Sequence, residues 1–125
     1  MFYSSGIIQR PKNDQKEGWY SLSLDQQISD LYKWYYSRGL KTWNAPLNEC
    51  HMTFIAGEKD DRIVSHDEME RFFDNEIVFY YTNVVYTNGK AFWLPAICTQ
   101  LDQIRLELCL KPRILYHVTL GNIKN

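Results

Sequence analysis

Two of the three histidines in this chain occur in the same short pattern. His51 to Phe54 and His117 to Leu120 both read histidine, apolar residue, threonine, apolar residue. Alternate side chains of an extended strand point to opposite faces, so each histidine would share a face with its threonine while the apolar residues face the core. Imidazole exchanges a proton near neutral pH, and a hydroxyl both donates and accepts hydrogen bonds. Two copies on one cleft would suit acid–base chemistry at a phosphate.

The paired motifs, with Gly121 directly after the second, resemble the 2H phosphoesterase superfamily. The resemblance is to its compact, Swiss-army-knife-like branch, which is found often in phage and bacterial genomes. It implies a two-lobed α+β fold with mainly antiparallel sheets flanked by helices, and a central cleft between the two motif strands. The expected catalytic residues are His51, Thr53, His117 and Thr119.

These four residues could cleave a phosphodiester without a metal or another cofactor. One histidine would accept a proton from the attacking 2′-hydroxyl or water, and the other would protonate the leaving oxygen. The threonine hydroxyls would hold the non-bridging phosphate oxygens, whose charge must be stabilised through the transition state. The sequence does not say which histidine is the acid and which is the base.

The resemblance implies two substrate classes for such a phosphodiesterase. One is cyclic oligonucleotide second messengers, which phage relatives cleave to blunt host defence, and the other is 2′,3′-cyclic phosphate ends of RNA or nucleotides. Aromatic residues make up 15% of the chain and its net charge is −1, which favours a small stacked ligand over long RNA, and the lack of a basic block argues against a duplex DNA partner. The alternatives are a module that sequesters a nucleotide without cleaving it, and an adaptor domain whose motifs are incidental surface pairs.

Several aromatic and basic residues are candidates to contact the substrate. The expected binding residues are Trp93, Tyr116, Trp43, Tyr3 and Arg113. Trp19 is a further candidate to stack a base, with a place in the core as the alternative for each ring. Arg105 is expected to be solvated at a helix surface, and His66 in the first turn of another helix.

A metal centre is the main chemical alternative to the two-histidine mechanism. Catalytic zinc normally takes three protein ligands. Glu49 would share a strand face with His51, but no other side chain near the motifs completes a set, so no metal is expected. Cys50 would point to the opposite face from His51, which disfavours a cysteine nucleophile.

The chain of 125 residues is long enough for a single domain covering 1–125. No signal peptide or membrane-spanning stretch stands out, which predicts a cytoplasmic protein with no membrane partner, in the host cytoplasm if a phage encodes it. A capping box at Ser65 and Glu68 predicts a helix start, and Asn88-Gly89 predicts a hairpin turn. The expected strands are 2–9, 48–56, 76–87, 90–94 and 113–120, and 19–24 is either a short strand or the entry to a helix. The expected helices are 26–38, 65–74 and 100–109, and 43–47 is expected to be a connector.

Overall fold

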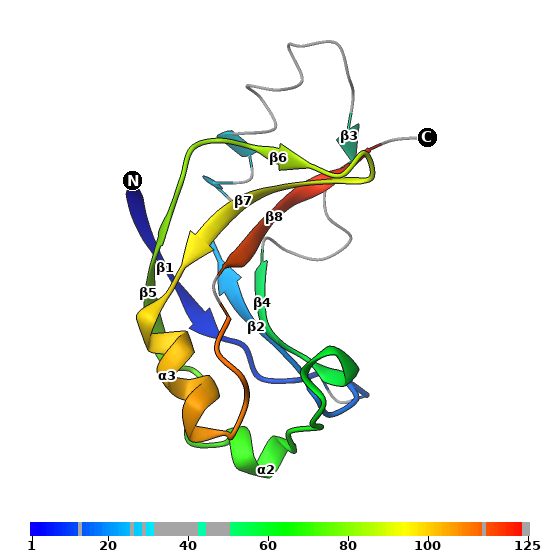
Figure 1. The fold of residues 1–125 in the computed structure, drawn as a ribbon, viewed down its shortest axis with the longest axis vertical. Helices are drawn as coiled ribbons and strands as arrows, with labels where there is room; N and C mark the ends of the chain where they lie inside the picture. Colours follow the sequence, from blue (N-terminus) through cyan, green and yellow to red (C-terminus); the bar gives the residue numbers. More distant parts are fainter. Residues whose placement is uncertain are drawn as a thin grey trace.

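The computed structural model describes residues 1–12, 14–25, 27–28, 30–31, 43–44, 51–113 and 115–123, which form an α+β fold. The described strands are β1 (Phe2–Ile8), β2 (Trp19–Leu24), β3 (Trp43–Asn44), β4 (His51–Ala56), β5 (Glu76–Tyr81), β6 (Tyr86–Thr87), β7 (Ala91–Ile97) and β8 (Tyr116–Ile123). The helices are η1 (Gly57–Asp60), α2 (His66–Met69) and α3 (Thr99–Glu107). The strands form one antiparallel sheet in the order β3-β8-β7-β5-β1-β2-β4, with β6 paired to β7 (Figure 1).

The sheet curls until its two motif strands approach each other, which makes it a nearly closed, barrel-like sheet. In the pairing order β4 and β8 lie far apart, yet they contact each other without a backbone ladder between their described residues. Because every pairing is antiparallel, β4 and β8 run in opposite senses. The start of β8 therefore lies toward the end of β4.

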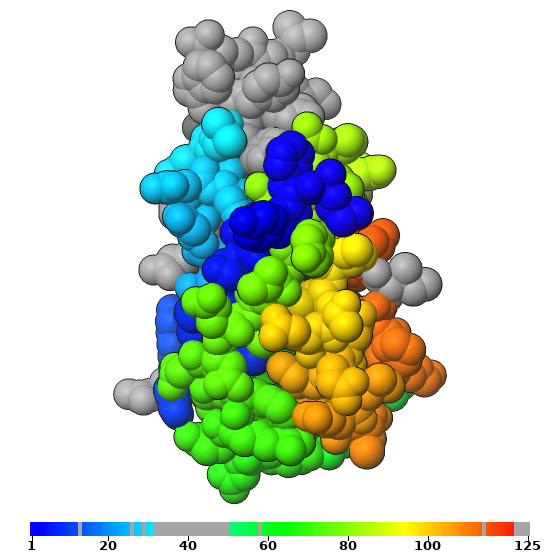
Figure 2. All heavy atoms as spheres, turned by 90° about the vertical axis from the view of Figure 1, so that its left-hand side faces the viewer, coloured from blue at the N-terminus to red at the C-terminus, as the bar shows by residue number. Residues whose placement is uncertain are grey.

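Alternation along each strand separates a buried apolar face from a polar one. Met52 and Phe54 on β4 are fully buried, as are Val118 and Leu120 on β8, and α3 packs into the same core. The motif histidines and threonines occupy the other face of the same strands. Figure 2 shows another part of the sheet, where β1 lies beside β5. The alternation of buried apolar side chains with outward polar ones, expected for both motif strands, is therefore observed.

Local signals in the sequence predict several elements correctly. The Ser65 hydroxyl accepts from the Glu68 amide and the Glu68 carboxylate accepts from the Ser65 amide, so the capping box is present. Asn88-Gly89 joins β6 to β7, and Gly89 has a positive φ of 87°, as tight hairpin turns require. The helix expected at 100–109 is α3.

Three other expectations about the elements are wrong. The strand expected at 76–87 is broken, because β5 pairs with β1 and β7 whereas β6 pairs only with β7. The connector expected at 43–47 includes β3, which pairs with β8. The helix expected at 65–74 ends at Met69, and Asp74 adopts a left-handed φ of 68°.

Most of the helix expected at 26–38 lies outside the described residues, although 27–28 and 30–31 are helical.

None of the helices in the described ranges is long and apolar enough to cross a membrane.

Candidate functional site

A groove of about 220 Å³ lies where β4 and β8 approach each other. Thr53 from β4 lines it together with His117 and Thr119 from β8. Three of the four expected catalytic residues therefore face one hollow, although β4 and β8 lie far apart in the pairing order. The rest of the described lining is Trp19, Ala56, Lys59, Arg113, Leu115 and Tyr116.

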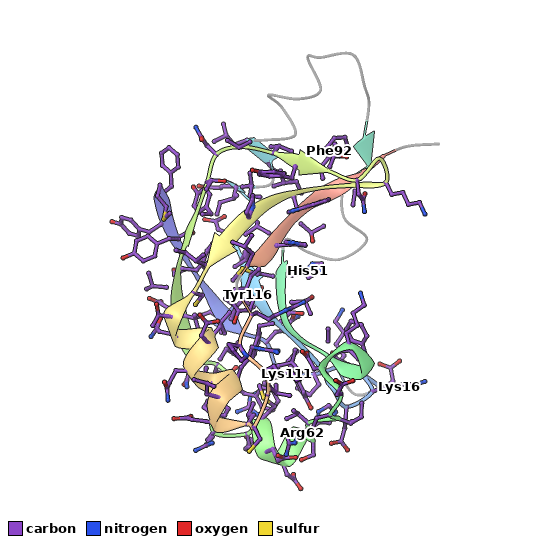
Figure 3. All side chains as sticks on the ribbon, in the orientation of Figure 1. Lys16, His51, Arg62, Phe92, Lys111 and Tyr116 are labelled. Atoms are coloured by element: carbon purple, nitrogen blue, oxygen red, sulfur yellow. The ribbon has the colours of Figure 1, made fainter. Side chains whose placement is uncertain are left out.

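His51 lies on the same face of β4 as Thr53, at the start of the strand and outside the lining of this groove. Figure 3 shows it at the end of β4 opposite to η1. Its partner in the β2–β4 register is Ser23, and Thr53 faces Ser21, whose Oγ lies 3.4 Å from Thr53 Oγ1. Because β4 and β8 run in opposite senses, the direction from Thr53 to His51 follows β8 from His117 toward Thr119.

The imidazole of His117 is held from one side by an aromatic ring. It stacks on Trp93 of β7 with ring centroids 5.0 Å apart and an interplanar angle of 27°, while the residue remains exposed on the groove side. Partial burial lowers the pKa of His117, and the positive charge of Arg113 lowers it further. The neutral imidazole, which can accept a proton, is therefore favoured.

Positive charge gathers along this groove. Its described lining includes Lys59 and Arg113 but no carboxylate. A larger hollow of about 560 Å³ near α2 and α3 has the opposite character, because Asp67, Glu68, Glu70 and Glu107 line it. Although the whole chain carries a net charge of −1, the groove between β4 and β8 suits an anion and the larger hollow does not.

A buried arginine ties β4 to the segment that leads into β8. Arg105 on α3 is 1% exposed, and its Nη1 donates to the carbonyl of Phe54 at 2.7 Å. Nε and Nη2 donate to the carbonyl of Lys111 at 3.0 and 2.6 Å, on the loop before β8 (Figure 3). The β2–β4 register skips Phe54, so this carbonyl belongs to a β-bulge.

Asp60 completes this buried cluster. Its Oδ1 accepts from Arg105 Nη2 at 2.8 Å, and its Oδ2 accepts from the Ala56 amide at 2.7 Å. Burial alone would raise the pKa of Asp60, but the hydrogen bonds from Arg105 and Ala56, with the charges of Arg105 and Arg113, lower it below its ordinary value. The carboxylate thus stays ionised next to the guanidinium.

Arg113 makes a second bridge between the motif strands. Its Nη1 donates to the carbonyl of Thr53 at 3.2 Å, and its guanidinium lies 5.8 Å from the centroid of the Tyr116 ring. Consecutive carbonyls of β4, at Thr53 and Phe54, are therefore both bound by arginine side chains from the α3–β8 segment. These contacts cover an edge of β4 that would otherwise be open and fix its distance from β8.

The expected substrate-binding residues lie in different places relative to the groove. Arg113 lines the groove, and Trp93 touches His117 with one face of its ring. Tyr116 borders the groove but is 1% exposed and donates its hydroxyl to Asp102 at 2.5 Å, so its ring is a core residue that cannot stack a base. Burial, and then the bond to Asp102, raise the pKa of its hydroxyl. Tyr3 lies beside Tyr80 and does not line the groove.

Trp43 lies in β3, and its side chain is outside what the structure describes.

The expectation for Arg105 is wrong, and His66 lies in the first turn of α2 as expected but is less solvated than expected. Arg105 is buried, and His66 is partly buried, with Nδ1 2.9 Å from the Tyr20 hydroxyl and Nε2 3.2 Å from the Gln15 carbonyl. A signal for Arg105 was present, because Leu101, Ile104, Arg105 and Leu108 fall on one helical stripe. No sequence pattern points to Lys59, which joins the groove only through the turn of η1 after β4.

Comparison with protein-family models, with curated proteins and with solved structures finds no match. Within the described ranges, no group of three or more histidine, cysteine, aspartate or glutamate side chains is placed to hold a metal ion.

Proposed function

We propose that this protein is a phosphodiesterase of the 2H type, which cleaves a nucleotide phosphodiester by two-histidine acid–base catalysis. The observation that carries the proposal is the groove itself. Thr53, His117 and Thr119, which the sequence singles out by one repeated pattern, line a single hollow together with Lys59 and Arg113. A hollow with hydroxyls, an imidazole and cations suits a phosphodiester.

The arrangement of β4 and β8 also supports a two-lobed interpretation of the sheet. β4 ends one run of antiparallel pairings, β1-β2-β4, and β8 belongs to the other, β5-β7-β8-β3. The described residues of β4 and β8 meet without a ladder, and arginine side chains from α3 and from the loop before β8 bind the β4 carbonyls instead. We take these runs as the two lobes, with the phosphate between them.

In this mechanism His117 is the general base and His51 is the general acid. His117 removes the proton from an attacking 2′-hydroxyl while the bond from that oxygen to phosphorus forms. The bond from phosphorus to the leaving oxygen breaks, and that oxygen receives a proton from His51. The Thr53 and Thr119 hydroxyls donate to the non-bridging oxygens. Stacking on Trp93 orients His117, and its lowered pKa keeps it ready to accept the proton.

The expected substrate is a cyclic oligonucleotide messenger, as for phage enzymes that counter host defence. The second candidate is a 2′,3′-cyclic phosphate at the end of an RNA or nucleotide, which the same groups would open with water as the nucleophile. The small groove, with the His117 imidazole and the two threonine hydroxyls in its lining, fits either bond. A sequestering module is the alternative of another class, and the test below separates it.

Incubation with cyclic dinucleotides, cyclic trinucleotides and 2′,3′-cyclic mononucleotides in EDTA tests the proposed function. We expect chromatography to show at least one substrate converted, and the product identifies the bond that was broken. Activity that disappears in EDTA and returns with a divalent metal would contradict the mechanism. Tight binding measured by calorimetry without any product would favour sequestration.

The pH dependence of kcat/KM should report the influence of the Arg113 charge on the pKa of His117. The Arg113 charge lowers the pKa of His117, so Arg113→Gln should raise that pKa. Since the base must be neutral, the acidic limb of kcat/KM should then move to higher pH, whatever the change in the maximal rate. Arg113→Lys, which keeps the charge, is the control and should leave the limb nearly in place. An acidic limb of kcat/KM that lies at the same pH in Arg113→Gln as in the wild-type protein would exclude His117 as the base.

A further inference from the structure

The groove extends beyond the residues proposed for catalysis. Its volume of about 220 Å³ is below the roughly 300–1,000 Å³ of pockets that enclose a whole drug-sized ligand. It can therefore surround a phosphodiester, while the nucleosides on either side must lie along its rim. The rim next to Thr53 continues past Ala56 to Lys59 and Trp19.

Trp19 offers an aromatic surface at that end. It starts β2, its register partner is Ala56, and 47% of its surface is exposed although it lines the groove. Its indole packs against Gly57, where a Cβ would lie 2.5 Å from Trp19 Nε1. Gly57 also has a φ of +48°, so both its conformation and this contact require glycine. The ring is therefore supported by Gly57 while nearly half of the residue stays exposed.

Two cations flank the same end. Lys59 on η1 is exposed, and Arg113 uses Nη1 for the Thr53 carbonyl while a guanidinium carries five N–H donors. The histidines supply the proton transfer, so the donors of Lys59 and the remaining donors of Arg113 can bind phosphate, although the charge of Arg113 also acts on His117. An aromatic face beside cations is the combination that binds single nucleotides of a chain, because the base stacks and the phosphate pairs.

We propose that the Trp19 end of the groove is a second nucleotide subsite. The base of the nucleotide next to the scissile bond stacks on Trp19, and the following phosphate lies between Lys59 and Arg113. The substrate is then a linear or cyclic oligonucleotide with at least two nucleotides, in preference to a 2′,3′-cyclic mononucleotide. This inference rests on the proposed function.

Steady-state kinetics of Trp19→Ala test the subsite. With the best substrate of two or more nucleotides, KM should rise about tenfold or more and kcat should change little, because base stacking contributes to binding of the chain. With the 2′,3′-cyclic mononucleotide of the same base, KM should change less than about twofold. Tyr80→Ala is the matched control: Tyr80 is 49% exposed, lies beside Tyr3 and does not line the groove.

Lys59→Ala provides a second variant that leaves the core untouched. It should raise KM for the oligonucleotide and reduce the slope of log KM against log salt by roughly one, because one phosphate contact is lost. Equal effects of Trp19→Ala on both substrates would overturn the subsite. So would a wild-type kcat/KM for the mononucleotide that matches or exceeds that for every oligonucleotide.

A failure of the proposed function can be distinguished from a failure of the subsite. If the wild-type protein cleaves none of the substrates, calorimetry with the cyclic dinucleotides decides the matter: weaker binding by Trp19→Ala than by Tyr80→Ala supports the subsite. Absence of binding by the wild-type protein, or equal binding by both variants, overturns it.

Discussion

Replacing His117 with alanine is expected to lower turnover by about a hundredfold or more, the scale of general acid–base catalysis. His117 is exposed and lines the groove together with Thr53 and Thr119, so the substitution removes the base without opening the core. His51→Ala should cause a loss of the same order by removing the acid. Initial rates at saturating substrate in EDTA, with circular dichroism to confirm folding, measure both effects.

The double variant separates this mechanism from two independent contributions. Because acid and base act on the same displacement, His51→Ala combined with His117→Ala should be little slower than either single variant. His66→Gln is the control histidine: it lies outside the groove and bonds to Tyr20 and Gln15, so it should keep its turnover even if its melting temperature falls. Near-normal turnover of folded His117→Ala would rule out the proposed mechanism.

Much of the framework follows from local patterns. Alternation at 51–54 and 117–120 predicts which residues are buried, and Met52 and Val118 are indeed fully buried. The capping box and the Asn88-Gly89 turn are short-range features in which side chain and backbone interact within a few residues, so the sequence reveals them directly. The α+β character and the antiparallel sheet follow from these elements.

Long-range pairing is where local patterns fail. Nothing between Glu76 and Thr87 marks the change of partner that separates β5 from β6. The bulge at Phe54 arises from the register with β2, and alternation alone does not reveal it. Tyr116 lies three residues past the groove cation Arg113, but its place on the apolar face of β8 makes it a core residue. Sequence identifies the motif residues, and the contact between β4 and β8 determines which others join them.

Arg105→Met should destabilise the fold by about 3–5 kcal/mol, the usual result of removing one member of a buried ion pair. Asp60 would be left ionised in a site where the two side chains are only 2% and 9% exposed. The carbonyls of Phe54 and Lys111 would lose their donors as well. Urea denaturation at neutral pH measures the change in unfolding free energy. Arg71→Met is the control, because the Arg71–Glu107 pair is exposed and contributes at most about 1 kcal/mol.

The pH dependence of this destabilisation identifies its cause. In the wild-type protein the pKa of Asp60 is lowered, so its contribution to stability is present above the ordinary carboxyl pKa and declines as the pH falls through the lowered value. Without Arg105, burial would raise that pKa, and the carboxyl would become neutral at a higher pH. The difference in stability between the two proteins should therefore shrink on acidification. Arg105→Met combined with Asp60→Leu should recover part of the loss but not all, since the Phe54 and Lys111 carbonyls stay unpaired. A loss as small as that of Arg71→Met would show that β4 is held beside β8 by other contacts.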